Sequence, residues 1–168
     1  GRLFSREGRF PSWNGSASRN AYLHDVLFDD DGRLHVTWVY RETAGTWASN
    51  HDLHYAVSKD GGRTWLNNDG KQIADLSDDD PIAIDDPGIV VRDVPVFSWI
   101  MNQGAMALDH RGHPHVLTYK LPAPRRPKNV GHGPPADVRR DLRYVHWWCD
   151  DDGVWQGGKP MALGPASV

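Results

Sequence analysis

Apolar and polar residues alternate over short stretches of the chain, and turn-forming residues separate these stretches. The clearest stretch, residues 34–40, reads Leu-His-Val-Thr-Trp-Val-Tyr, in which successive side chains face opposite sides of a strand. It follows three aspartates and Gly32, and a glycine at this point supplies the positive φ that a tight hairpin turn needs. The pattern therefore predicts short strands joined by turns, an all-β fold.

Two segments of the chain resemble each other at a spacing of 80 residues. Residues 21–38 align with residues 101–118, and His35 then matches His115. Each copy reads as strand, Asp/Gly turn and strand, which is the pattern of a β-hairpin. Self-similarity at such a period is typical of stacked β modules.

Each copy continues into a second pair of strands. Residues 52–58 lead into 60–65, and residues 141–147 lead into 150–155. Four antiparallel strands per copy are the blade of a β-propeller, which closes only with about four to eight blades. We therefore expect this chain to be a fragment of a propeller, whose remaining blades lie outside it.

We assign residues 1–168 to a single, partial propeller domain. It contains a blade at 22–65, an inter-blade excursion at 66–100 that ends in a strand at 96–100, and a blade at 101–156. The flanking residues are expected to belong to neighbouring blades. A Pro/Gly-rich loop at 121–138 interrupts the second blade, and loops of this length are often functional.

The segment from Ser58 to Trp65 fits the Asp-box pattern S-x-D-x-G-x-x-W at every fixed position. The carboxylate of Asp60 is expected to accept hydrogen bonds from turn amides, and Trp65 to fill the gap between sheets. We interpret both as fold determinants. The second copy, 151–155, lacks the serine.

Charge and composition narrow the possible functions. The formal net charge of −3 excludes a generally basic nucleic-acid binder. A local basic segment at 125–143 could still meet an anionic ligand. No apolar run is long enough to cross a bilayer, so we expect no membrane insertion. The single Cys149 cannot form an internal disulfide.

Several of these segments together resemble a known family. Residues 22–40, the run Asn-His-Asp-Leu-His-Tyr at 50–55, the Asp box and Asn-Gln-Gly at 102–104 look like BNR-repeat proteins of the propeller type that includes ulvan lyases. The resemblance implies a seven-bladed propeller that acts on an acidic polysaccharide by β-elimination at a uronic acid. It also implies that the full-length protein is secreted or periplasmic, although no signal is visible in this chain.

Ulvan lyases of this type place two histidines, a tyrosine and an arginine around the propeller mouth. The resemblance assigns the catalytic positions to His24, His51 and Tyr119, and Asn102 could polarise the substrate carboxylate. The arginine that neutralises this carboxylate remains open among Arg139, Arg140 and Arg143. Aligning Tyr55 with Tyr144 places His51 opposite Arg140.

The expected reaction requires no cofactor, but some ulvan lyases hold a structural zinc. His146 and Cys149 are the candidate ligands here, with His132 or His110 as further donors, since imidazole nitrogen and thiolate sulfur both suit zinc. Strand alternation, however, directs residues three apart to opposite faces unless a turn intervenes.

Two other functions remain open. Asp boxes also occur in sialidase-like glycoside hydrolases, but hydrolysis needs carboxylic-acid or Tyr/Glu machinery, and Glu7 and Glu42 are the only glutamates. The third alternative is a glycan-binding propeller without catalysis, in which histidines bond to sugar hydroxyls and tryptophans stack on sugar faces.

Overall fold

Two antiparallel β-sheets form the protein, as a computed structural model describes it for residues 3–4, 19–42, 47–128 and 133–165. The first sheet has the order β1-β2-β3-β4-β5, and β6 also pairs with β3. Its strands are β1 (Asn20–Phe28), β2 (Leu34–Arg41), β3 (Asn50–Ser58), β4 (Thr64–Leu66), β5 (Gln72–Asp75) and β6 (Val90–Arg92). The second sheet has the order β10-β9-β8-β7. Its strands are β7 (Ala105–Leu108), β8 (Pro114–Lys120), β9 (Arg143–Cys149) and β10 (Trp155–Pro165).

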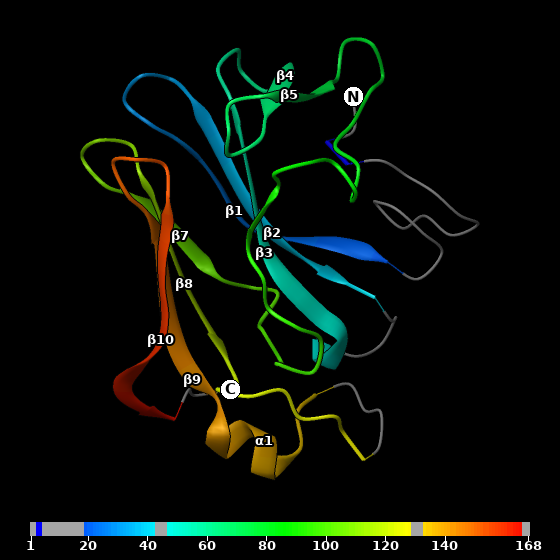
Figure 1. Ribbon diagram of the computed structural model, residues 1–168, viewed down its shortest axis with the longest axis vertical. Helices are drawn as coiled ribbons and strands as arrows, with labels where there is room; N and C mark the ends of the chain where they lie inside the picture. Colours follow the sequence, from blue (N-terminus) through cyan, green and yellow to red (C-terminus); the bar gives the residue numbers. More distant parts are fainter. Residues whose placement is uncertain (1–2, 5–18, 43–46, 129–132, 166–168) are drawn as a thin grey trace.

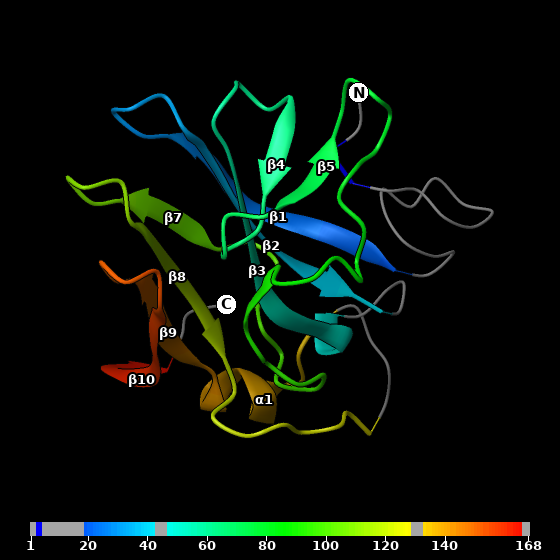
Figure 2. The same cartoon turned by 45° about the horizontal axis from the view of Figure 1, so that its top comes forward.

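Helical structure is confined to two short elements in the described residues, η1 (Trp47–Ser49) and α1 (Ala136–Asp141). Figure 1 shows the two sheets side by side, with α1 at one end. The β1–β2 and β7–β8 turns lie together at the other end, and Figure 2 shows the same arrangement. The all-β prediction is confirmed. Neither described helix is long and apolar enough to cross a membrane.

The two predicted hairpins form with the same turn. In the first, the amide of Gly32 donates to the carbonyl of Asp29 at 3.0 Å, and Gly32 has φ +78°. In the second, Gly112 donates to Asp109 at 2.9 Å with φ +80°. The internal repeat is therefore present in three dimensions and in sequence.

The Asp box closes the β3–β4 turn as its sequence predicts. Asp60 Oδ1 accepts the backbone amides of Arg63 and Thr64 at 3.1 and 2.9 Å, and Oδ2 accepts the Thr64 hydroxyl. Hydrogen bonds from Thr64 lower the pKa of Asp60 to about 2. Trp65 is buried and its indole nitrogen donates to the carbonyl of Gly62. These contacts give Asp60 and Trp65 structural roles.

The main core lies between the two sheets. Strands β2 and β3 contribute apolar side chains that pack against residues of β7, β8, β9 and β10. The buried members are Val39, Leu53, Tyr55, Val94, Ile100, Met106, Val116, Val145, Trp147, Cys149 and Trp155. A second core covers the opposite face of the first sheet, where Trp38 and Tyr40 pack with Phe4, Ile82 and Ile89. The first sheet is consequently covered on both faces.

The strand expected at 96–100 is not formed. Phe97 and Trp99 have positive φ angles of 67° and 55°, so the backbone turns there. The amide of Phe97 donates to Ala48, and that of Leu121 to Ser98, which fixes this turn between η1 and the end of β8. Trp99 is buried in a third cluster with Trp47, Leu121, Val138 and Leu142, so its apolar character reflects burial in a loop.

Strand β10 is an edge of the second sheet, and a bulge interrupts its pairing with β9 between Gly157 and Pro160. Gly157 has φ +89°, and a Cβ there would lie only 2.2 Å from the carbonyl oxygen of His146. Only glycine fits such a close backbone approach. The bulge bends β10 away from a regular ladder.

Candidate functional site

Most of the predicted site residues lie at the end of the molecule that carries α1. His51 is the second residue of β3, Tyr119 is the last but one of β8, and Arg143 begins β9. Asn102 lies in the segment that enters β7, whereas His24 lies in the middle of β1. The candidate catalytic and binding side chains are therefore concentrated at the end of the molecule that carries α1.

Arg41, the last residue of β2, links three parts of this end. Its Nε donates to Asn50 Oδ1 at 2.8 Å, Nη1 to the Tyr22 hydroxyl at 3.1 Å, and Nη2 to Asn102 Oδ1 at 3.0 Å. Its guanidinium carbon also lies 4.2 Å from the centre of the Tyr22 ring. Asn50 is fully buried and donates to the carbonyl of Ile100 at 2.8 Å. The network holds the first sheet against the segment that leads into the second.

His24 packs against the same segment. Its Nε2 donates to the carbonyl of Met101 at 3.2 Å, whereas its Nδ1 is buried without a partner among the described residues. Burial lowers the pKa of His24 to about 4, so the ring is neutral near pH 7. Gly104 gives the ring its space, since a Cβ there would lie 2.9 Å from the imidazole.

His51 lies between two carboxylates. Its Nδ1 is 2.8 Å from Asp52 Oδ2, and its Nε2 is 2.8 Å from Glu42 Oε1, which also accepts a hydrogen bond from Arg19 at 2.7 Å. Burial opposes the charged ring, but the two carboxylates outweigh it and raise the pKa of His51. Its other ring neighbours are Tyr40 and the buried His54.

Asp52 is held in one position. Its φ is +52°, and its Oδ1 accepts the amide of Val94 at 2.8 Å while its own amide donates to the carbonyl of Val94 at 3.0 Å. A carboxylate on Nδ1 fixes the orientation of an imidazole and stabilises its cation, leaving Nε2 to exchange protons. Glu42, whose side chain is 30% exposed, occupies the Nε2 side. Asp52 thus orients the ring as a general base requires, and Nε2 can take a substrate proton once Glu42 releases it.

Tyr119 packs among aromatic rings. Its ring centre is 6.1 Å from Trp47 and 5.9 Å from Tyr144, in edge-to-face geometry. Burial raises the pKa of Tyr119 to about 12, so the phenol is protonated near neutral pH. Its backbone carbonyl accepts the amide of Met101 at 3.0 Å, which ties its strand to the segment that holds Asn102.

Two of the three candidate arginines, Arg139 and Arg143, are bound to nearby backbone. Arg139 Nε donates to the carbonyl of Pro134 at 2.9 Å, and Arg143 donates to the carbonyls of Arg140 and Leu142. The Arg140 side chain is 75% exposed. Within the described ranges, none of the three contacts His24, His51, Tyr119 or Asn102 through a side-chain hydrogen bond or ion pair.

Strand pairing corrects the predicted equivalence of His51 with Arg140. His51 pairs with Tyr40, and the residue 80 positions after Tyr40, Lys120, pairs with Arg143. The predicted counterpart, Arg140, is therefore three residues too early. Two of these residues arise because the sequence alignment matched Tyr55 with Tyr144, whereas strand pairing matches Tyr55 with His146. The third residue of the shift arises from a bulge in the first sheet, where the pairing changes register between Trp38 and Tyr40. Arg143 thus occupies the position that corresponds to His51.

Comparison with known proteins agrees with this architecture. A family model described as a BNR repeat-containing family member matches residues 3–160. The chain belongs to this BNR-repeat family. No curated protein matches it.

Among solved structures, this BNR-repeat chain is similar to polysaccharide lyases. It matches an ulvan lyase of family PL25 with a TM-score of 0.62 and 16% identity, covering 88% of this chain and 32% of that one. The same type of lyase bound to -[GlcA(1-4)Rha3S]- gives 0.59 and 18%, with the same coverage. The polysaccharide lyase Uly1 gives 0.55 and 14%, covering 83% and 28%. The fold is therefore that of the ulvan lyases, and the chain spans about a third of their length.

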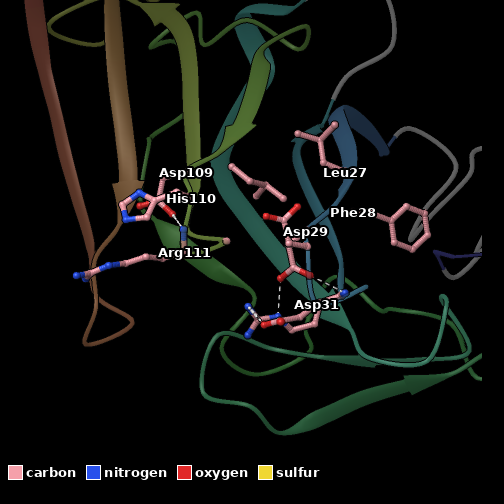
Figure 3. A pocket seen from close by; sticks show the side chains of 11 residues that line it. Leu27, Phe28, Asp29, Asp31, Asp109, His110 and Arg111 are labelled. Carbon is pink, nitrogen blue, oxygen red and sulfur yellow. Dashed lines mark hydrogen bonds and ion pairs between the residues drawn. The ribbon is translucent and has the colours of Figure 1, made fainter.

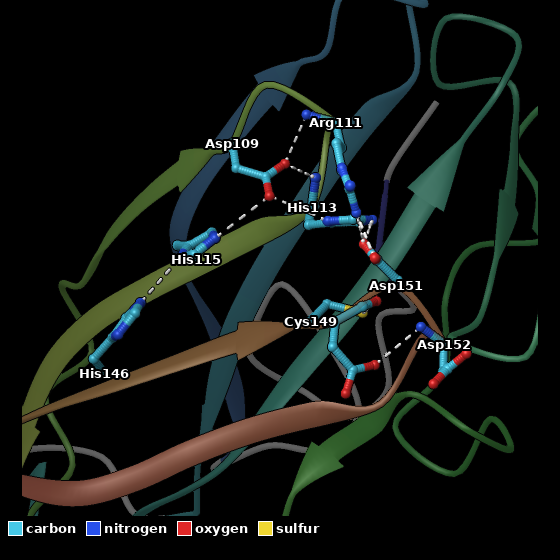
Figure 4. Close-up of polar contacts among 9 residues, drawn as sticks. Asp109, Arg111, His113, His115, His146, Cys149, Asp151 and Asp152 are labelled. Carbon is cyan, nitrogen blue, oxygen red and sulfur yellow. Dashed lines mark hydrogen bonds and ion pairs between the residues drawn. The ribbon is translucent and has the colours of Figure 1, made fainter.

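The two predicted zinc ligands of this BNR-repeat chain are not brought together. Cys149 faces the core between the sheets, whereas His146 lies on the outer face of the second sheet, 3.0 Å from His115 (Figure 4). The His146 ring also stacks on Trp148. The regular alternation of β9 causes this separation. No group of three or more metal-binding side chains occurs in the described part of the chain. His132 lies outside the described residues.

The opposite end of the molecule carries a hollow between the two hairpin turns (Figure 3). It has a volume of about 530 Å³ and is lined by residues 27–31 and 108–112 with Arg33. His110, the other predicted zinc donor, lies here. Asp29 in its wall is already bonded to Arg33 and His35. The hollow contains none of the predicted catalytic residues.

Sequence reasoning missed three residues of the site: Tyr22, Arg41 and Asp52. Asp52 carried a usable signal, because it follows His51 directly and a neighbouring carboxylate can orient an imidazole. Arg41 and Tyr22 are 19 residues apart and meet only in the folded sheet. No motif in the sequence indicates that these two side chains contact each other.

Proposed function

We propose that the full-length protein is a polysaccharide lyase that cleaves a uronic-acid-containing anionic polysaccharide, such as ulvan, by β-elimination. The observation that carries the proposal is the imidazole of His51, oriented by Asp52 at 2.8 Å, at the same end of the molecule as Asn102. The ulvan-lyase fold supports it. A protein that acts on an external polymer is secreted or periplasmic, and the reaction needs no cofactor.

The reaction divides among this chain's residues as follows. Neutral His51 takes the C5 proton, the electron pair of the C–H bond forms the C4–C5 double bond, and the C4–O4 bond breaks. Tyr119, protonated near neutral pH, gives its proton to the departing O4. Asn102 and one of Arg139, Arg140 and Arg143 hold the carboxylate, which makes the C5 proton more acidic. The second histidine, His24, donates a hydrogen bond to the carbonyl of Met101 and so positions the segment that carries Asn102.

The deciding experiment is incubation of the full-length protein with ulvan and other uronate polymers. Elimination creates a double bond conjugated with the carboxylate, so ultraviolet absorbance rises with time. New reducing ends without absorbance would instead indicate a sialidase-like hydrolase. Binding without either product would indicate a glycan-binding propeller. Both of these outcomes reject the lyase proposal.

The pH profile of elimination tests the role of His51. The raised pKa of His51 means that the base form appears only as the pH rises through that value, so kcat/KM should increase from acid toward alkaline pH. Glu42→Gln removes one of the two carboxylates that raise this pKa. We expect the acidic limb of the profile to move to lower pH, measured between about pH 5 and pH 9.

Asp151→Asn is the matched control, because Asp151 is an exposed carboxylate paired with Arg111 at the other end of the molecule. It should leave the limb in place. An acidic limb that stays unchanged in Glu42→Gln, or moves to higher pH, would exclude His51 as the base.

We also propose that the outer face of the second sheet packs against a further four-stranded sheet. In the first sheet, His35 bonds to the Tyr55 hydroxyl at 2.8 Å inside the core. The equivalent pair in the second sheet, His115 and His146, lies on an open face. Likewise Thr37 is 0% exposed, but Leu117, its equivalent, is 40% exposed. The repeat thus predicts a covering module of the same kind.

Cysteine labelling in the full-length protein tests this packing. Leu117→Cys should resist a maleimide reagent, whereas Val154→Cys, at a turn residue 52% exposed, should react readily. The native Cys149 is buried, and the unsubstituted protein gives the background. Equal labelling of both positions would show that the face is open.

A further inference from the structure

The charge of Arg41 is not neutralised by a carboxylate within the described part of the chain. Its three acceptors are the neutral oxygens of Tyr22, Asn50 and Asn102. Glu42, the next residue, is engaged by Arg19 and His51. Burial lowers the pKa of Arg41, but a guanidinium remains charged in proteins. A half-buried, unbalanced cation at this end favours a bound anion.

The contact with Arg41 also fixes which way the Asn102 amide faces. A guanidinium can only donate, so the Asn102 atom 3.0 Å from Nη2 is the acceptor oxygen. The Nδ2 group is then directed away from Arg41. It makes no hydrogen bond to any described residue and is not among the buried unpaired atoms. Its two N–H groups are free to donate to a ligand.

Arg41 orients a second amide, that of Asn50, at a fully buried position. Asn50 Oδ1 accepts from Arg41 Nε, and its Nδ2 donates to the carbonyl of Ile100 at 2.8 Å. Arg41 thus binds the side-chain oxygens of both Asn50 and Asn102. The Asn50 amide nitrogen then donates to the protein, whereas that of Asn102 is left for a ligand. Asn102 lies on the segment entering β7, next to Met101.

We propose that Arg41 is a positioning residue that orients Asn102, so that the amide N–H groups of Asn102 donate to the uronate carboxylate of the substrate. This inference rests on the proposed function and names the group that holds its carboxylate. Arg41 acts through Asn102, whose amide its charge orients and polarises. Because its fork spans three acceptors, lysine cannot replace it.

Asn102→Asp tests the contact between Arg41 and residue 102 without reference to activity. The substituted oxygen becomes a carboxylate that still faces Arg41, and a charge-assisted hydrogen bond is stronger than a neutral one. We expect the melting temperature of the full-length protein to rise by about 2–4 °C. Asn68→Asp is the control, since Asn68 bonds only to neutral groups, Gly153 and Trp155, and should lower it. A fall in Asn102→Asp would show that residue 102 does not contact Arg41 and would overturn the proposal.

A double-mutant cycle on elimination of a glucuronate polymer tests the positioning role. Asn102→Ala and Arg41→Gln should each lower kcat/KM about 10- to 100-fold, the range for a hydrogen bond to a charged group. In the Asn102→Ala background, Arg41→Gln should cost much less. Arg41→Lys should not restore the activity, and Arg111→Gln, at an exposed ion pair, should have no effect.

Full additivity of Asn102→Ala and Arg41→Gln would show that Arg41 does not act through Asn102, and would overturn the proposal. If the unsubstituted protein does not perform elimination, the proposed function fails. The same cycle is then read from the affinity for a glucuronate-containing oligosaccharide by calorimetry, and the melting temperature of Asn102→Asp still decides whether Arg41 contacts residue 102.

Discussion

Replacing His51 with alanine is expected to lower the kcat of uronate elimination by about 100- to 10,000-fold, the usual contribution of a positioned general base. His51 has a carboxylate 2.8 Å from each ring nitrogen, and His113, which is flanked in the same way, lies at the hairpin-turn end of the molecule, away from Asn102 and Tyr119. His24 cannot substitute, because its Nδ1 is buried and its Nε2 is held by the backbone carbonyl of Met101, whereas Nε2 of His51 faces the partly exposed Glu42. The rate of absorbance increase with saturating polymer measures the effect.

Asp52→Asn separates catalysis from folding in the same experiment. It preserves the shape of the side chain but weakens the hold on the His51 cation, so kcat should fall while the thermal unfolding curve shows a folded protein. Arg111→Ala, at the opposite end, should retain full activity. If His51→Ala folds and keeps more than about a tenth of the native kcat, the base is another residue.

Trp38→Ala is expected to lower the free energy of unfolding by about 3–5 kcal/mol, the range for truncating a buried aromatic side chain. Trp38 is 0% exposed. Its ring lies 5.1 Å from Phe4 and 5.3 Å from His54. The cavity left by alanine would open the core that covers the outer face of the first sheet. Urea unfolding at equilibrium measures the loss.

Two further variants make this stability prediction specific. The indole nitrogen of Trp38 has no partner among the described residues, so Trp38→Phe should cost less than Trp38→Ala. Phe28→Ala removes a ring that is 64% exposed and should change stability by no more than about 0.5 kcal/mol. Similar losses for Phe28→Ala and Trp38→Ala would contradict the burial of Trp38.

The parts of the fold that the sequence predicts correctly are those that neighbouring residues determine. Gly32 and Gly112 set both hairpin turns, and Asp60 gathers hydrogen bonds from residues at most four positions away. Alternation in 34–40 places Trp38 on one face and Val39 on the other. Each of these features needs only local geometry.

The features that the sequence does not predict depend on distant contacts. Phe97 and Trp99 lie in an apolar run that resembles a strand, but burial against η1 and Leu121 holds them in a turn. The bulge opposite Trp38 and Tyr40 leaves no mark in the composition, although it shifts the counterpart of His51 by one residue, to Arg143.

The site shows the same division between local and distant information. His51 and Asn102 could be proposed from short motifs. Arg41 could not, because its bond to Asn102 spans 61 residues and its partners are neutral. The predicted zinc ligands His146 and Cys149 lie on opposite faces for a local reason, the alternation of β9, which spacing alone already indicated.

The bulge at Gly157 has a consequence for self-association. An exposed edge strand offers unpaired backbone groups to other chains, and a long regular edge invites fibrillar aggregation. In β10 the ladder is interrupted, Pro160 has no amide to donate, and Lys159 adds charge. The rim of the second sheet is thereby protected from strand-to-strand polymerisation.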